Sequence, residues 1–221
     1  MSENSFSYTV EQFADLQILR YRVPGFEQLS LRRKQLVYYL SQAALEGRDI
    51  LFDQNGKFNL QIRRLLEAVY TSFKGDRTTE QFRALEVYLK RVWFSNGIHH
   101  HYACDKFVPA FTAAYLEEVI KSLPEEVLPL EEGETRQAMC DKLFPVIFDP
   151  SVMSKRVNQA DGEDLVQTSA ANYYEEVTQQ EAEDFYAAQK KADDPEPVMY
   201  GMNSRLVKKD GRVYEQVWKV G

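Results

Sequence analysis

The sequence of 221 residues has few of the residue types from which metal and disulfide frameworks are built. It contains two cysteines, Cys104 and Cys140, which are far apart and form no Cys-x-x-Cys pair. A disulfide scaffold and a zinc ribbon are therefore both disfavoured, and reduced thiols are compatible with a cytosolic protein. The three histidines are consecutive, at His99, His100 and His101, so imidazole chemistry is confined to one short segment.

The sequence also lacks long apolar and long basic runs. No apolar run approaches the roughly 18 residues of a membrane span, and the first residues resemble no secretion signal. The longest basic run, Arg32–Lys34, lies in a helical pattern, and the net charge is −7, which argues against nucleic-acid binding. We predict a protein with no nucleic-acid and no membrane partner, in the cytoplasm, or in the periplasm if a signal has been removed.

Familiar catalytic motifs are absent as well. The chain has no His-Glu-x-x-His helix, no Gly-x-Ser-x-Gly nucleophile elbow and no Gly-rich nucleotide-binding loop. Cys104 lies close to His101 in sequence, but that spacing alone does not make a thiol protease. Because the chain stops at Gly221, just after an incomplete strand pattern, we interpret it as part of a larger enzyme that carries binding surface without the catalytic centre.

What the sequence does contain is a globular composition rich in aromatic residues. Hydrophobic residues make up 44%, and there are 13 tyrosines and 13 phenylalanines. The length fits one large domain or two small ones and suffices to bury a core. Most of these rings are expected in that core, although tyrosine retains a polar end that suits the wall of a cleft.

Helical patterns fill the first two thirds of the chain. A capping box at Thr9 predicts a first helix that runs through Leu19, and Ser30 is expected to cap a second helix. The remaining predictions are a turn over 50–58, a helix over 59–73, a helix that ends at Asn96, an irregular stretch over 145–172, and a helix that begins at a Thr178–Glu181 capping box.

The pattern becomes that of β-structure near the C-terminal end. A Pro- and Asp-rich linker over 193–199 separates a helical part, residues 1–192, from a hairpin segment, residues 200–221. Asp210-Gly211 is a strong signal for a two-residue hairpin turn, and imperfect alternation leaves room for a bulge. Because a lone hairpin is marginal in water, further strands should pair with it. The predicted fold class is α+β, mainly helical with a C-terminal β-hairpin.

Residues 96–109 are the candidate functional segment. Zinc needs three or four ligands that converge within about 2.0–2.3 Å, whereas consecutive side chains diverge, so at most two of these histidines could share one ion. We therefore predict no metal ligand here. Two interpretations remain: a polar loop with internal hydrogen bonds, and a loop whose imidazole and phenol groups bond peptide substrate along a cleft. The candidate substrate-binding residues are Asn96, His99, His100, His101 and Tyr102.

Several stretches of the chain resemble one known family. They are FADLQILRYRVPGF at 13–26, residues 36–53, VYLKRVWF at 87–94, the histidine segment, and YGMNSRL at 200–206. In these stretches the chain resembles the N-terminal part of dipeptidyl peptidase III, in its Bacteroidetes-type form. The resemblance covers nearly the whole chain. It is most specific in the histidine segment and weakest over residues 124–165.

The resemblance implies a two-lobed zinc exopeptidase that releases dipeptides from the N-termini of peptides. In that family a His-Glu-x-x-Gly-His motif and a later glutamate hold zinc, and the motif glutamate activates a zinc-bound water. No position of this chain matches them. The implied role is a non-catalytic lower lobe, made of helices and a small, here incomplete, β-barrel, that forms one wall of the cleft. Zinc is expected in the missing lobe, and the implied partners are the peptide substrate and that lobe of the same polypeptide.

Tyr102 is the position onto which an aromatic substrate subsite of the family can be carried. The family's Lys-Phe-Val-Pro stretch aligns with Lys106–Pro109 without a gap, and the subsite residue lies just before it. The three histidines replace different residues in eukaryotic members. Two other classes stay open: an autonomous protein-interaction module without enzymatic activity, and a small metal-binding protein centred on the histidines.

Overall fold

The computed structural model describes residues 6–190, 193 and 203–218. The chain forms two compact units, Met1–Arg48 and Asp49–Gly221, so the division falls within the range that the sequence assigned to one helical part. Each unit is described by itself below.

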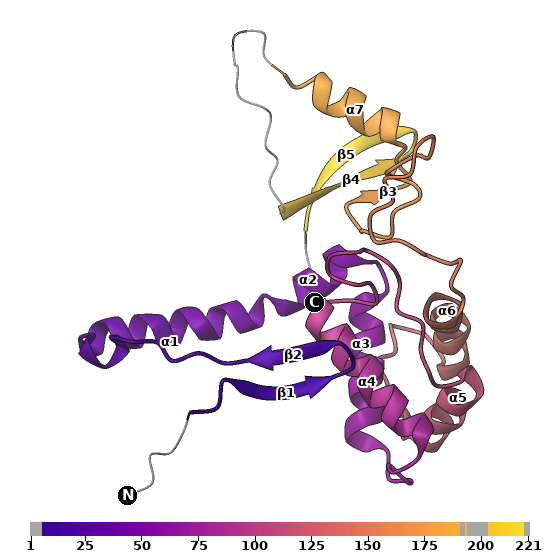
Figure 1. The fold of residues 1–221 in the computed structure, drawn as a ribbon. Helices are drawn as coiled ribbons and strands as arrows, with labels where there is room; N and C mark the ends of the chain where they lie inside the picture. The colour runs from indigo at the N-terminus through magenta and orange to yellow at the C-terminus, as the bar shows by residue number, and fades with distance from the viewer. Residues whose placement is uncertain (1–5, 191–192, 194–202, 219–221) are drawn as a thin grey trace, which may run out of the picture. The chain divides into compact units, whose positions relative to one another are not determined.

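Helices dominate the structure and small sheets accompany them (Figure 1), so the predicted α+β class with a C-terminal hairpin is confirmed. The predicted linker over 193–199 lies, apart from Asp193, outside the described residues. None of the described helices has the length and apolar character needed to cross a membrane.

The N-terminal unit begins with a β-hairpin where the sequence pattern predicted a helix. Strands β1 (Thr9–Phe13) and β2 (Leu16–Leu19) pair antiparallel. Ala14, between them, has φ +47°, the left-handed conformation that tight hairpin turns require. The Thr9 hydroxyl accepts a hydrogen bond from the Gln17 side-chain amide at 2.7 Å. The helix prediction is wrong because Thr9 serves cross-strand pairing instead of capping a helix.

The same unit continues into a 3-10 turn, η1 (Phe26–Gln28), and the long helix α1 (Leu31–Glu46). Ser30 caps α1 as predicted, since its Oγ accepts the N–H of Arg33 at 3.4 Å. No residue of α1 is buried, which is unusual for a helix with so much apolar surface. The exposed apolar side chains at its centre are Leu36, Val37, Tyr38, Tyr39 and Leu40.

The second unit contains the remaining helices, most of which surround one main core. They are α2 (Arg48–Asn55), α3 (Asn59–Ser72), α4 (Glu80–Ser95), α5 (Ala113–Ser122), the 3-10 turn η2 (Glu125–Val127), α6 (Arg136–Phe148) and α7 (Gln179–Ala187). The core lies among α3, α4, α5 and α6. Apolar side chains at helical spacing on α3 and α4 are buried there, which confirms the two predicted helices.

The predicted turn over 50–58 is wrong for most of its length. α2 continues to Asn55, and the chain turns only around Gly56. Phe52 is buried against the main core, and this burial outweighs the turn preference of Asp53 and its neighbours. The predicted irregular stretch is helical only over 145–148, where α6 passes through Pro145, and from 149 to 172 it contains neither helix nor strand, as predicted.

The second unit also holds a three-stranded sheet with strand order β3-β4-β5. β4 (Ser204–Lys209) and β5 (Arg212–Val217) form the predicted hairpin around Asp210-Gly211, both with positive φ, and their pairing contains no bulge. β3 (Tyr174–Glu175) is the extra partner of the hairpin and pairs parallel with β4. Figure 1 shows α7 beside this sheet, and Leu206 of β4 is buried in the small core between them. The barrel stays a prediction.

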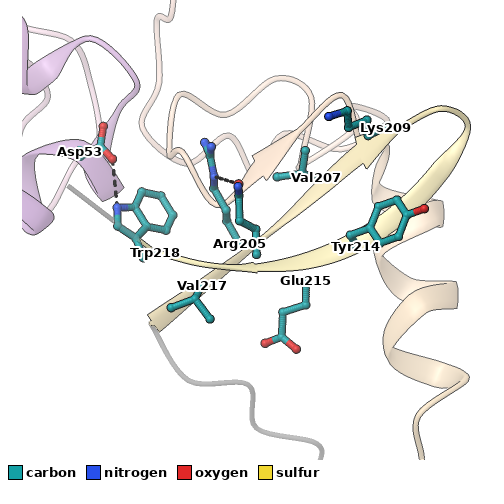
Figure 2. Close-up of a pocket in the computed structure, with 9 residues that line it drawn as sticks. Asp53, Arg205, Val207, Lys209, Tyr214, Glu215, Val217 and Trp218 are labelled. Carbon is teal, nitrogen blue, oxygen red and sulfur yellow. Dashed lines mark hydrogen bonds between the residues drawn. The ribbon is translucent and has the colours of Figure 1, made fainter. Parts of the chain in front are cut away.

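One long-range hydrogen bond ties the hairpin to α2. The Trp218 indole Nε1–H donates to the Asp53 carboxylate at 3.0 Å (Figure 2). Burial raises the pKa of Asp53, although this hydrogen bond and the charge of Arg205 lower it. The Arg205 guanidinium also lies over the Trp218 ring, 5.5 Å from its centroid.

Truncation of the α3 core is expected to destabilise the second unit. Leu65 is fully buried, so Leu65→Ala should lower the free energy of unfolding by about 2–5 kcal/mol through lost transfer energy and a residual cavity. Urea unfolding monitored by circular dichroism measures the change. Glu118→Ala on exposed α5 surface is the control and should stay within about 0.5 kcal/mol. Equal effects of the two substitutions would show that this core is misassigned.

Candidate functional site

The histidine segment folds into a tight, hydrogen-bonded loop. Its two ends run antiparallel, because the Phe107 N–H donates to the Ile98 carbonyl and the His100 N–H donates to the Asp105 carbonyl, both at 2.8 Å. The Cys104 N–H closes the tip by donating to the His100 carbonyl at 3.0 Å. We call residues 96–107 the histidine loop.

Two asparagines hold the first half of the histidine loop. The Asn55 side-chain amide donates to the Asn96 carbonyl at 3.0 Å, and Asn59 Oδ1 accepts the Ile98 N–H at 3.3 Å. Gly97 between them has φ +152°, and a Cβ there would lie 2.4 Å from Asn59 Nδ2. The loop therefore depends on a glycine at this position, since a larger residue would push the supporting asparagine away.

The second half of the loop is held by residues 153–156. The Lys106 N–H donates to the Ser154 carbonyl at 3.1 Å, and the Arg156 N–H donates to the Cys104 carbonyl at 2.9 Å. The Arg156 guanidinium also donates from Nη2 to the His101 carbonyl at 3.0 Å. The loop is thus fixed to the segment that follows α6.

Lys106 links the histidine loop to the C-terminal end of α6. Its ammonium group donates to the carbonyls of Val146 at 2.9 Å and Val152 at 2.6 Å, and also to that of Asp149. The last carbonyls of a helix lack helical partners and carry partial negative charge, so a cation is favourable there. Burial lowers the pKa of Lys106, while the charge of Asp149 opposes this.

His99 lies inside the core rather than on a surface. It is 2% exposed, and its Nε2 lies 2.7 Å from the Met153 carbonyl. Because a carbonyl only accepts, Nε2 carries the proton. Burial lowers the pKa of His99 to about 4, despite the opposing effect of that hydrogen bond. Direct contact between His99 and a substrate is therefore not expected in this structure.

The next three residues form the outer part of the loop. His100 Nδ1 accepts the N–H groups of Tyr102 at 3.2 Å and Ala103 at 3.0 Å, so this imidazole fixes the turn. The His100 and His101 rings are stacked with centroids 4.5 Å apart, and Phe94 meets His101 edge-on at 5.0 Å. Tyr102 is 85% exposed and lies over this small aromatic stack, 4.5 Å from the His101 ring.

Two of the imidazole nitrogens take part in hydrogen bonds. His99 Nε2 and His100 Nδ1 already have hydrogen-bond partners. Among the residues that the structure describes, no three or more histidine, cysteine, aspartate or glutamate side chains are grouped so that they could hold an ion. Asn96, the remaining predicted residue, serves as the left-handed C-cap of α4, with φ +51°, and its carbonyl is held by Asn55.

Sequence reasoning missed the residues that support the loop. Asn55 carried only a turn signal, and Asn59 only a place at the start of a helix. Lys106 lies in the stretch that carries the family resemblance, which is the one signal that could have pointed to it. Arg156 lies in a stretch without periodicity, so nothing local marks it.

No family model matches this chain, and no curated protein matches it.

Stability is expected to fall on acidification because of His99. In the unfolded chain this imidazole titrates near 6.5 and in the folded chain near 4, so between these values only the unfolded state binds the proton. Between pH 7.5 and 5.5 the unfolding free energy should drop by about 1.4 kcal/mol from this group. Urea unfolding at both pH values measures the drop.

His99→Gln should remove that part of the pH dependence, since an amide donates to the Met153 carbonyl without titrating. His100→Gln keeps the buried imidazole and is the matched control. A His99→Gln protein with the same pH slope as the parent would contradict this assignment.

Lys106→Met is expected to lower the unfolding free energy by about 2–4 kcal/mol, because half-buried carbonyls at the end of α6 lose their donor. Lys155→Met is the control: this lysine pairs with Asp105 at the surface, and exposed pairs contribute at most about 1 kcal/mol. Thermal and urea unfolding of both variants give the comparison. Similar losses would mean that Lys106 does not cap α6.

Proposed function

We propose that this chain is the non-catalytic, peptide-binding N-terminal lobe of a zinc-dependent dipeptidyl peptidase. The observation that carries the proposal is the exposed ring of Tyr102, which the histidine loop holds out from a backbone pinned on both sides. This is the position onto which the family resemblance carries an aromatic substrate subsite.

A pinned aromatic residue is well suited to contact a peptide. Tyrosine offers a large apolar face and a hydroxyl that both donates and accepts. Because His100 Nδ1 fixes the turn beneath the ring, little conformational freedom of the backbone is lost on binding. In this proposal the loop orients a peptide and takes no part in bond cleavage.

Two surfaces support the idea that further protein covers this chain. α1 buries no residue and exposes a run of apolar side chains. β5 pairs with β4 on one side, and no other described strand pairs with its second edge. Apolar helices and free strand edges in water promote association. Additional strands of a barrel and a second lobe would cover them.

In the proposed enzyme the catalytic power resides outside this chain. A zinc ion bound by the other lobe would activate the water that attacks the peptide bond. The contribution of the present residues is to bind and orient the peptide when the lobes close. Tyr102 would contact the peptide, while Asn55, Asn59 and Arg156 hold the loop in position.

An autonomous interaction module is the second candidate. The uncovered apolar side chains of α1 favour it, because they could equally dock on another protein. The two candidates differ in what the gene encodes beyond the codon for Gly221. The peptidase proposal expects a downstream His-Glu-x-x-Gly-His motif, and its absence would leave the interaction module.

In the enzyme encoded by the full open reading frame, Tyr102→Ala should raise KM for a peptide by roughly tenfold, because a loss of about 1.4 kcal/mol of binding corresponds to that factor. Steady-state hydrolysis of a chromogenic dipeptide substrate measures the effect. Tyr102→Phe keeps the ring and should retain most affinity. Tyr21→Ala, another exposed tyrosine, is the control. Unchanged KM in Tyr102→Ala would remove the loop from the binding site.

A further inference from the structure

A second pocket shares supporting residues with the histidine loop. It has a volume of about 420 Å³, and Asn55 and Arg156 both line it. It differs from the pocket of Figure 2, which lies along the hairpin and α2. We call it the tyrosine pocket. Its apolar lining consists of Tyr173, Tyr174, Tyr186, Val157, Leu165 and Val166.

The walls of the tyrosine pocket are fixed by backbone hydrogen bonds. The N–H of Ala171 donates to the Arg156 carbonyl at 3.0 Å, and the N–H of Asn172 donates to the Gln54 carbonyl of α2 at 2.9 Å. The Tyr173 carbonyl accepts the Leu206 N–H of β4 at 2.9 Å. The irregular segment is thus held from α2, from the 155–158 stretch and from the sheet. The cavity is formed without a ligand, as is usual for binding pockets.

The charge of the tyrosine pocket is of one sign. Among the described residues that line it, Arg156 is the only charged one, in a chain whose net charge is −7. The Arg156 guanidinium contacts the His101 carbonyl and the Cys104 sulfur through Nη2. An arginine among the residues that line an apolar cavity favours a ligand that joins a carboxylate to a bulky apolar group.

The lining also includes Ser204 and Asn55, whose side chains can recognise an amide. Ser204 donates its hydroxyl proton to Glu215 at 2.6 Å, which leaves its oxygen lone pairs able to accept an N–H. The Asn55 side-chain amide donates to the Asn96 carbonyl, so its side-chain oxygen remains an acceptor. A carboxylate, an apolar side chain and an amide N–H together describe the last residue of a peptide.

We propose that the tyrosine pocket binds the C-terminal residue of a peptide, with its apolar side chain among the three tyrosines and its carboxylate on Arg156. The peptide nature of the ligand rests on the proposed function. Arg156 also donates to the His101 carbonyl. A ligand that binds Arg156 in the pocket therefore affects the histidine loop through this side chain.

The experiment is a titration of the intact chain, labelled with ¹⁵N, by N-acetyl-phenylalanine, with N-acetyl-phenylalanine amide and octanoate as comparison ligands. Amide signals of Ala171, Tyr173 and Tyr174 should shift on binding, followed by those of Tyr102 and Cys104. The carboxylate form should bind at least ~10-fold more tightly than the amide form, as expected for a charge-assisted hydrogen bond.

Arg156→Gln should abolish the preference for the carboxylate, and Ala171→Phe should block binding by filling the cavity while leaving Arg156 in place. Arg83→Gln, on the exposed face of α4, is the matched control and should bind as the parent does. The spectrum of each variant without ligand reports whether it is folded.

Equal affinity for the acid and the amide, or shifts confined to other surfaces, would overturn the proposal. Octanoate binding as tightly as N-acetyl-phenylalanine would replace the peptide by an aliphatic acid and overturn it as well. The titration involves no zinc and no bond cleavage. Its failure therefore leaves the peptidase assignment in place, and a gene without the zinc motif leaves the measured binding in place.

Discussion

The histidine loop depends on polar side chains from other segments that satisfy its backbone. Asn55 and Asn59 hold its first half and Arg156 holds its second half, whereas Lys106, which belongs to the loop itself, fastens it to a carbonyl of α6. Backbone groups that leave water without partners cost free energy, so these four side chains select one conformation of the loop. The backbone that carries the exposed ring of Tyr102 is therefore held in place.

Short sequence patterns were sufficient to predict those elements whose conformation is set by residues close together in the chain. Asp210-Gly211 predicts its hairpin because two residues with positive φ define the turn, and the apolar stripe of α4 follows from helical spacing alone. The helix predicted at Thr9 is wrong because a hydroxyl that suits a helix cap can equally form a hydrogen bond between two strands. The contact between Arg156 and the His101 carbonyl joins residues 55 apart, and such pairings leave no periodic trace in a sequence.

The three consecutive histidines have the same side chain but differ in exposure and in hydrogen-bond partners. The side chains of His99 and His100 diverge, since His99 points into the core and His100 turns back to its own backbone. The His100 and His101 rings do not diverge but stack on each other. The sequence could group these residues but could not rank their exposure, because that depends on the Met153 carbonyl and on α6. Of the predicted contact residues, Tyr102 is by far the most exposed.

The hydrogen bond between Trp218 and Asp53 has a consequence for synthesis of the chain. Its partners are 165 positions apart, so α2 emerges from the ribosome long before the indole that completes its surroundings. The helices α3 to α6 make their contacts over shorter separations and can assemble first. During that interval the Asp53 carboxylate keeps its water, and it loses part of that water only when the final strand arrives. This contact can therefore form only after both of these distant segments have been synthesised.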